Sequence, residues 1–144
     1  MSLVQTGMNM MKDRVPKVIG PKAHAVIDYA VAGSFFAMGA FFWSRHKRAA
    51  ISSFICGGAV TINSVLTDYP GGVWKKLSFE THGKVDAGLV GAAGSMPGLM
   101  GFSDDDEAKF FRFQALTEAA VTAMTDFHAM DRTDYYRHGR EEAA

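Results

Sequence analysis

Apolar residues gather in four long stretches, separated by short blocks of charge, at residues 25–43, 49–66, 85–102 and 110–127. A surface helix of a soluble protein carries charges on the face opposite its apolar residues. The segments YAVAGSFFAMGAFFW and AAISSFICGGAV, from the first two stretches, have no charged face. Helices of this length reach about 27–29 Å, close to the hydrocarbon thickness of a bilayer. The pattern therefore predicts an all-α integral membrane protein with four spans.

The fourth stretch differs from the others because it contains Arg112, Gln114 and Glu118. Arg112 lies near the end of the stretch, from where its long side chain reaches the headgroups. Glu118 lies deeper, so it must face the protein interior, be protonated or find a partner. We expect a single interhelical hydrogen bond, to Asn63 or Gln114. A proton or ion path that uses this intramembrane carboxylate is the alternative.

The polar residues of the apolar stretches repeat at a fixed spacing. Adding 58 to the numbers of His24, Asp28, Gly33, Met38, Thr67 and Asp68 gives His82, Asp86, Gly91, Met96, Thr125 and Asp126. This register predicts two tandem copies of a helical hairpin, at 23–70 and 81–128. Each copy crosses the membrane twice, so both copies enter from the same side and the repeat is parallel. The predicted fold is a four-helix membrane bundle made of two such hairpins.

The repeat places six ionisable residues near one membrane face, and we call this set the polar collar. Its members are His24, Asp28, Asp68, His82, Asp86 and Asp126. We expect a structural role, in which each histidine hydrogen-bonds an aspartate of a neighbouring helix and no metal or cofactor is needed. Two alternatives remain open. The residue types suit a divalent metal, and the two histidines suit haem ligation between facing helices.

Small residues form a ridge along the third predicted helix. Gly94 and Gly98 make a GxxxG pair, and Ala87, Gly91 and Ser95 continue the spacing. Inside a membrane such small residues let helix backbones approach closely. We therefore predict that Gly91, Gly94 and Gly98 serve helix packing or subunit assembly.

Composition and motifs restrict the function classes. The 15 basic and 15 acidic residues cancel, and no basic stripe with interleaved aromatic residues indicates a nucleic-acid partner. The chain contains no GxSxG, P-loop, HExxH or GxGxxG motif, so we expect no enzyme. The best interpretation is a non-enzymatic scaffold or accessory subunit of a larger membrane assembly. Its partners would be the lipid bilayer and other membrane subunits or a second copy.

The regions outside the predicted membrane domain, 23–128, are polar. Residues 1–22 form a basic N-terminal segment without the apolar core of a cleavable secretory signal, and 129–144 form a polar tail. Ten basic residues fall on the side of the termini and five on the opposite side. Because positive charge accumulates on the cytoplasmic side, this asymmetry favours cytoplasmic termini.

Three segments, KAHAVIDYAVAG, THGKVDAGLVGAAGSMPGLMGFSDDDEAKFF and LTEAAVTAMTDF, resemble the small bacterial membrane proteins called SPW-repeat proteins. The resemblance covers residues 22–128. It implies paired hairpins that begin with a His-x-x-x-Asp segment, in a bacterial cytoplasmic membrane, and it implies no established reaction. The chain departs from the Ser-Pro-Trp motif: the second copy reads Ser95-Met96-Pro97-Gly98, and the first copy has no proline there.

Overall fold

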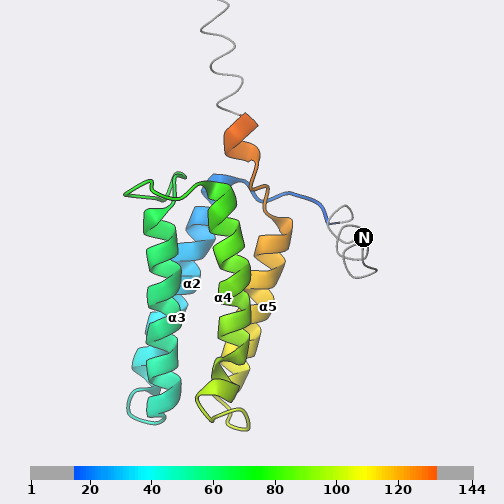
Figure 1. The fold of residues 1–144 in the computed structure, drawn as a ribbon. Helices are drawn as coiled ribbons and strands as arrows, with labels where there is room; N and C mark the ends of the chain where they lie inside the picture. The colour runs from blue at the N-terminus through cyan, green and yellow to red at the C-terminus, as the bar shows by residue number, and fades with distance from the viewer. Residues whose placement is uncertain (1–14, 133–144) are drawn as a thin grey trace, which may run out of the picture.

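The computed structural model describes residues 15–132, and over that range the chain is all-helical, as predicted. Figure 1 shows the four long helices lying side by side, each running in the opposite direction to the one before it. Parts of the two predicted polar flanks, 1–14 and 133–144, lie outside the described residues. The helices are α2 (Pro21–Phe42), α3 (Lys47–Leu66), α4 (Phe79–Leu99) and α5 (Ala108–Met124).

Local sequence explains where the helices begin and end. Pro21 opens α2 at a position where its missing N–H costs nothing. Ser78 precedes α4, and its hydroxyl accepts a hydrogen bond from the Thr81 N–H at 3.1 Å. The helix α4 therefore starts well before the apolar stretch that predicted it. At its other end, α4 stops at Leu99, two residues after Pro97.

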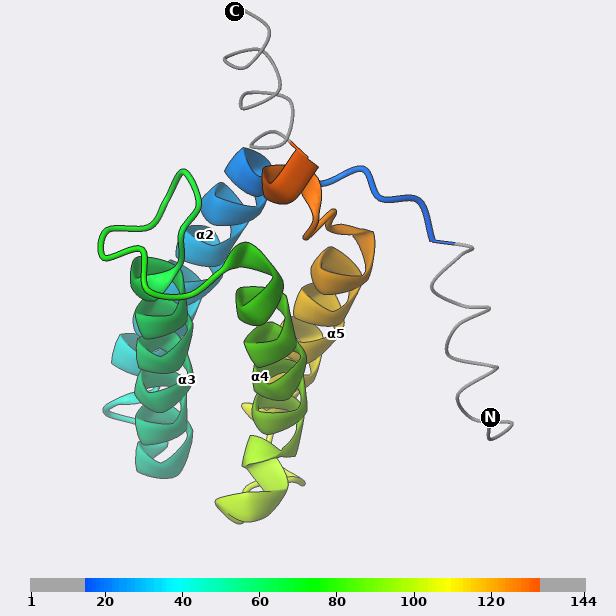
Figure 2. The same ribbon diagram turned by 45° about the horizontal axis from the view of Figure 1, so that its top comes forward.

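The connections divide between the two ends of the molecule. The α2–α3 and α4–α5 loops lie at one end, and the α3–α4 loop lies at the other, together with both ends of the described segment (Figures 1 and 2). Residue Ile19 joins the chain beyond α5, since its N–H donates to the Met124 carbonyl and its own carbonyl accepts from the Asp126 N–H. The start of α2, the start of α4 and the ends of α3 and α5 therefore meet at one end, which we call the collar end.

The core consists of a large apolar cluster and a smaller cluster, rich in aromatic rings, at the collar end. Phe35, Phe42, Phe102 and Phe111 are buried in the part nearer the α2–α3 loop. A smaller cluster of Ala25, Tyr69 and Phe79 lies at the collar end. Buried polar side chains lie between these two clusters, and they form the candidate site.

Within residues 15–132, the helices α2 and α3 are long and apolar enough to cross a membrane. Four spans were predicted, so the structure supports this prediction only for the first hairpin. Core helices of soluble proteins pass the same test, so length and composition alone indicate membrane association only weakly.

The small-residue ridge lies on the exposed side of α4. A Cβ added at Gly91 would meet nothing within 4 Å, and one at Gly94 would make an ordinary 3.4 Å contact with the Ala115 Cβ. A Cβ at Gly98 would likewise lie 3.6 Å from the Ser103 hydroxyl. Packing within the chain therefore does not require these three glycines, which corrects that half of the prediction. Other helical glycines do have close neighbours: an added Cβ would lie 3.0 Å from the Phe54 ring at Gly39, 3.0 Å from the Phe35 Cβ at Gly57 and 2.7 Å from the Phe127 ring at Gly83.

Candidate functional site

Four of the six predicted collar residues meet between α2 and α4. His24 and Asp28 come from α2, and His82 and Asp86 from α4; in each helix the two residues are four apart and so share one face. One ligand atom from each residue can be chosen so that all four atoms lie within 4.8 Å of one another. Both histidines and Asp28 are buried, and Asp86 is nearly so. We call these four residues the His–Asp cluster.

The contacts in the cluster cross between the helices as well as running along them. The two Nε2 atoms of His24 and His82 lie 3.1 Å apart. The Asp86 Oδ2 lies 3.1 Å from the His24 Nε2 and 3.0 Å from the His82 Nε2. Asp28 mirrors this, with Oδ1 at 3.3 Å from the His24 Nε2 and Oδ2 at 3.1 Å from the His82 Nε2. Each aspartate therefore contacts both histidines.

Two threonines determine which ring nitrogen of each histidine carries a proton. The Thr67 hydroxyl donates to the Asn63 carbonyl at 2.6 Å, and the Thr125 hydroxyl donates to the Val121 carbonyl at 2.7 Å. Because a hydroxyl has one hydrogen, each oxygen can only accept from its histidine. The Nδ1–H groups of His82 and His24 therefore donate to Thr67 and Thr125, both at 2.8 Å. In the neutral rings, both Nε2 lone pairs point into the cluster.

The aspartates are also held by neutral donors. The Tyr69 hydroxyl donates to the Asp28 Oδ2 at 2.8 Å, and the Asn63 amide donates to the Asp86 Oδ1 at 2.8 Å. Burial raises the pKa of Tyr69 well above its usual value, so the phenol remains a donor at physiological pH. These bonds fix the orientation of both carboxylates toward the histidines.

Aromatic rings cover the cluster at the collar end. The His24 ring has edge contacts with Phe79 and Phe127, at centroid distances of 5.4 and 5.3 Å. Tyr69 packs on the His82 ring at 5.2 Å. The side chains of both histidines are almost wholly shielded from solvent as a result.

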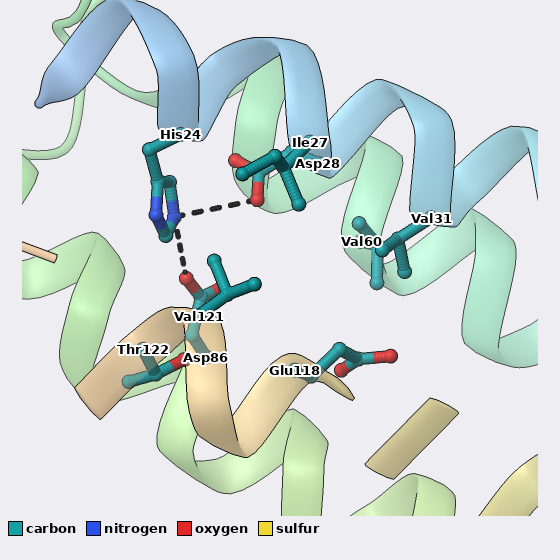
Figure 3. Close-up of a pocket in the computed structure, with 9 residues that line it drawn as sticks. All are labelled: His24, Ile27, Asp28, Val31, Val60, Asp86, Glu118, Val121 and Thr122. Carbon is teal, nitrogen blue, oxygen red and sulfur yellow. Dashed lines mark hydrogen bonds and ion pairs between the residues drawn. The ribbon is translucent and has the colours of Figure 1, made fainter. Parts of the chain in front are cut away.

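A small cavity adjoins the cluster on the side of α5, and Figure 3 shows its lining. Glu118 lines this cavity, and its carboxylate points away from His24 in this view. The Glu118 Oε1 atom is buried and has no hydrogen-bond partner among the described residues. The two expected partners are engaged elsewhere, since Asn63 donates to Asp86 and Gln114 donates to Ser34. The predicted hydrogen bond of Glu118 was therefore wrong.

The other two collar aspartates do not join the cluster. Asp68 follows α3 and forms an exposed ion pair with Lys75 at 2.8 Å. Asp126 follows α5 and pairs with Arg132, which lowers the pKa of this carboxyl. In the chain that leaves each helix, the residue before the aspartate, Thr67 or Thr125, is buried, and the aspartate itself turns to the surface. The predicted collar of six is thus a buried cluster of four with two surface ion pairs.

The geometry also bears on the haem alternative. Two Nε2 atoms at hydrogen-bond distance leave no space for the plane of a macrocycle between them. The cluster therefore does not fit two axial haem ligands, whereas four converging nitrogen and oxygen atoms do fit a small cation.

The sequence prediction missed the roles of four residues that hold the cluster. Thr67 and Thr125 were in the 58-residue register but were given no role, although both lie four residues after a carbonyl that their hydroxyls reach. Asn63 was considered only as a partner of Glu118. Tyr69 had no signal, because its equivalent in the second copy is Phe127.

Comparison with protein-family models, curated proteins and solved structures finds no match to this chain.

Proposed function

We propose that this chain is an integral membrane protein, a non-enzymatic scaffold or accessory subunit built as a four-helix bundle of two tandem hairpins. The observation that carries the proposal is the exposure of the two apolar helices. In the apolar 18-residue segment of each helix, only 39% of α2 and 50% of α3 is buried inside the structure. A core helix of a soluble protein is mostly buried, so these faces require another apolar environment.

The ends of the first hairpin carry side chains suited to a membrane interface. Trp43 follows α2 and is 50% exposed, with the Lys47 ammonium 3.7 Å from its ring centroid. Trp74 lies in the α3–α4 loop at the opposite end and is 64% exposed, next to Lys75 and Lys76. Tryptophan and lysine anchor spans at the headgroups of both leaflets. The 22 residues of α2 between them reach about 33 Å, enough to cross the hydrocarbon.

The His–Asp cluster supports the tandem repeat. His24 contacts Asp28 of its own copy and Thr125 of the second copy. His82, its equivalent 58 residues later, contacts Asp86 of its own copy and Thr67 of the first copy. An ancestral pair of identical hairpins would create such a reciprocal arrangement.

The exposed ridge on α4 supports a role in assembly. Gly91, Gly94 and Gly98 are exposed, and an added Cβ at any of them would meet no neighbour closer than 3.4 Å. In a bilayer, such a face suits close contact with a helix of another subunit or a second copy. A conducting role for Glu118 has less support, because the buried phenylalanines at positions 35, 42, 102 and 111 fill the interior toward the α2–α3 loop.

The resemblance to SPW-repeat proteins adds a bacterial cytoplasmic membrane as the proposed location, with both termini in the cytoplasm. Ten basic residues on the side of the termini against five on the other side support this orientation.

Membrane fractionation tests the proposal. Bacterial membranes that contain the full chain are washed with alkaline carbonate, which removes peripheral proteins. We expect the chain to stay in the pellet and to require detergent for release. Recovery in the soluble fraction without detergent would overturn the membrane proposal and leave a soluble helical domain.

A further inference from the structure

When its histidines are neutral, the His–Asp cluster brings acceptor atoms together with no donor or cation between them. Both Nδ1 atoms are used as donors to threonine hydroxyls. With neutral rings, two Nε2 lone pairs and the carboxylate oxygens of Asp28 and Asp86 therefore face one another at 3.0–3.3 Å. Acceptors repel one another at such distances, so something positive must lie among them.

We propose that His24, Asp28, His82 and Asp86 bind one divalent transition-metal ion of the zinc type, in tetrahedral N₂O₂ coordination. Ligand atoms about 2.0–2.2 Å from a tetrahedral centre lie about 3.3–3.6 Å from one another. The two Nε2 atoms and the Asp86 Oδ2 lie 3.0–3.1 Å from one another, within a few tenths of an ångström of that spacing. Asp28 lies equally close, with Oδ1 3.3 Å from the His24 Nε2 and Oδ2 3.1 Å from the His82 Nε2, so a small rotation of its carboxylate would direct one oxygen to the fourth position. A small outward adjustment of the side chains would admit the ion.

Charge and ligand type define the class of ion. Two carboxylates and two neutral imidazoles carry a charge of −2, which one divalent cation balances in a buried site. Imidazole nitrogen suits zinc and neighbouring transition metals, whereas magnesium and calcium prefer oxygen ligands and higher coordination numbers. The cluster offers only two carboxylates among four ligands, so we infer selectivity against those two ions.

The surroundings of the cluster have the form of a second coordination shell. A metal-binding histidine typically donates its other ring N–H to a fixed acceptor, which holds the ring and its tautomer. Thr67 and Thr125 do this for the two histidines, while Tyr69 and Asn63 orient the two aspartates. Each ligand is therefore held in place before the ion arrives.

The competing explanation is a protonated clasp, in which protons on Nε2 supply the positive charge and no metal binds. It predicts the same side-chain positions but a different response to added metal. This alternative and the metal site both go beyond the proposed role as a membrane scaffold, and neither depends on it.

The test uses the full chain, purified in detergent if it needs detergent, stripped with a chelator and then given Co²⁺ or Zn²⁺. Cobalt serves as the visible probe because tetrahedral Co²⁺ absorbs far more strongly than octahedral Co²⁺. We expect about one ion per chain and the tetrahedral spectrum. Mg²⁺ should not displace the cobalt, and Zn²⁺ should.

Variants assign the site. His24→Ala and His82→Ala should each abolish binding, the double variant should show no further loss, and the near-isosteric Asp28→Asn and Asp86→Asn should weaken binding at least 10-fold. The controls are Asp68→Asn and His128→Ala, which alter exposed residues of the same types at the collar end. His128 also belongs to an exposed trio with Glu80 and Asp131, so its variant tests that group as an alternative site.

The proposal would be overturned by a folded wild-type chain that binds no Co²⁺ or Zn²⁺, by an octahedral cobalt spectrum, or by binding that survives in Asp28→Asn and Asp86→Asn. Loss of binding in His128→Ala with retention in His24→Ala would move the site to the exposed trio, and so would also overturn it. The wild-type stoichiometry and spectrum do not depend on any variant, so they decide the question even where an alanine variant fails to fold.

Discussion

At the scale of single residues, the hydroxyl groups of Thr67 and Thr125 set the tautomers of the two buried histidines. Each donates to the carbonyl four residues earlier, a habit of threonine in helices. That local bond leaves the oxygen as an acceptor only, and so it determines the tautomer of a histidine on another helix. A short-range backbone interaction thereby sets the chemistry of a long-range contact.

We predict that Thr67→Val and Thr125→Val each lower the free energy of unfolding by about 1–3 kcal/mol, because a buried histidine N–H loses its acceptor. Chemical denaturation of the metal-stripped chain in detergent measures this change. Thr117→Val is the matched control, since Thr117 donates to the Phe113 carbonyl in the same way but is only half-buried on α5 and has no histidine partner among the described residues. Equal effects in all three variants would show that the histidine contacts do not matter.

At the scale of helices, contact between α2 and α3 depends on a glycine that the ridge prediction did not select. Gly57 of α3 faces α2, where an added Cβ would lie 3.0 Å from the Phe35 Cβ and 3.3 Å from the Ala32 carbonyl oxygen. Neither neighbour is the end of a flexible side chain. Its chain neighbour Gly58 has nothing within 4 Å of the same position.

Replacing these two glycines by alanine should therefore give different results. We predict that Gly57→Ala destabilises the chain by about 1–3 kcal/mol through overpacking, whereas Gly58→Ala does not destabilise it. Thermal unfolding in detergent, followed by circular dichroism, compares the two variants directly. A loss in Gly58→Ala as large as that in Gly57→Ala would contradict the packing shown by the structure.

At the scale of the whole molecule, the proposed membrane orientation places two loops on opposite sides. The α2–α3 loop contains the exposed Ser44, and the α3–α4 loop contains the exposed Val73. These loops lie at opposite ends of the helices (Figure 1). Cytoplasmic termini would put Ser44 outside the cell membrane and Val73 inside.

Cysteine labelling checks this orientation. In a Cys56→Ala background, which removes the chain's single cysteine, we predict that Ser44→Cys reacts with a membrane-impermeant maleimide applied to spheroplasts. Val73→Cys should react only after the membrane is permeabilised. The reverse pattern would place the termini outside, and reaction of both cysteines in sealed spheroplasts would contradict a span between them.

The sequence by itself determined the helices, and it did so because apolar runs without a charged face have few alternatives. The helices α2 and α4 begin earlier than the predicted stretches, at Pro21 and after Ser78, whose effects on a helix terminus are local. The 58-residue register also identified His24, Asp28, His82 and Asp86 as a related set, because two residues four apart on a helix necessarily share a face.

The tertiary structure decided what no local rule encodes. Whether Asp68 and Asp126 joined the histidines depended on where the chain leaves α3 and α5, and both turn outward into surface ion pairs. Whether Gly91 or Gly57 is needed for close packing depended on which side of each helix meets a neighbour. Tyr69 and Asn63 reach the cluster only because α3 ends beside α2 and α4, and that proximity is a property of the packed molecule, since side chains distant in sequence become partners only when the helices assemble.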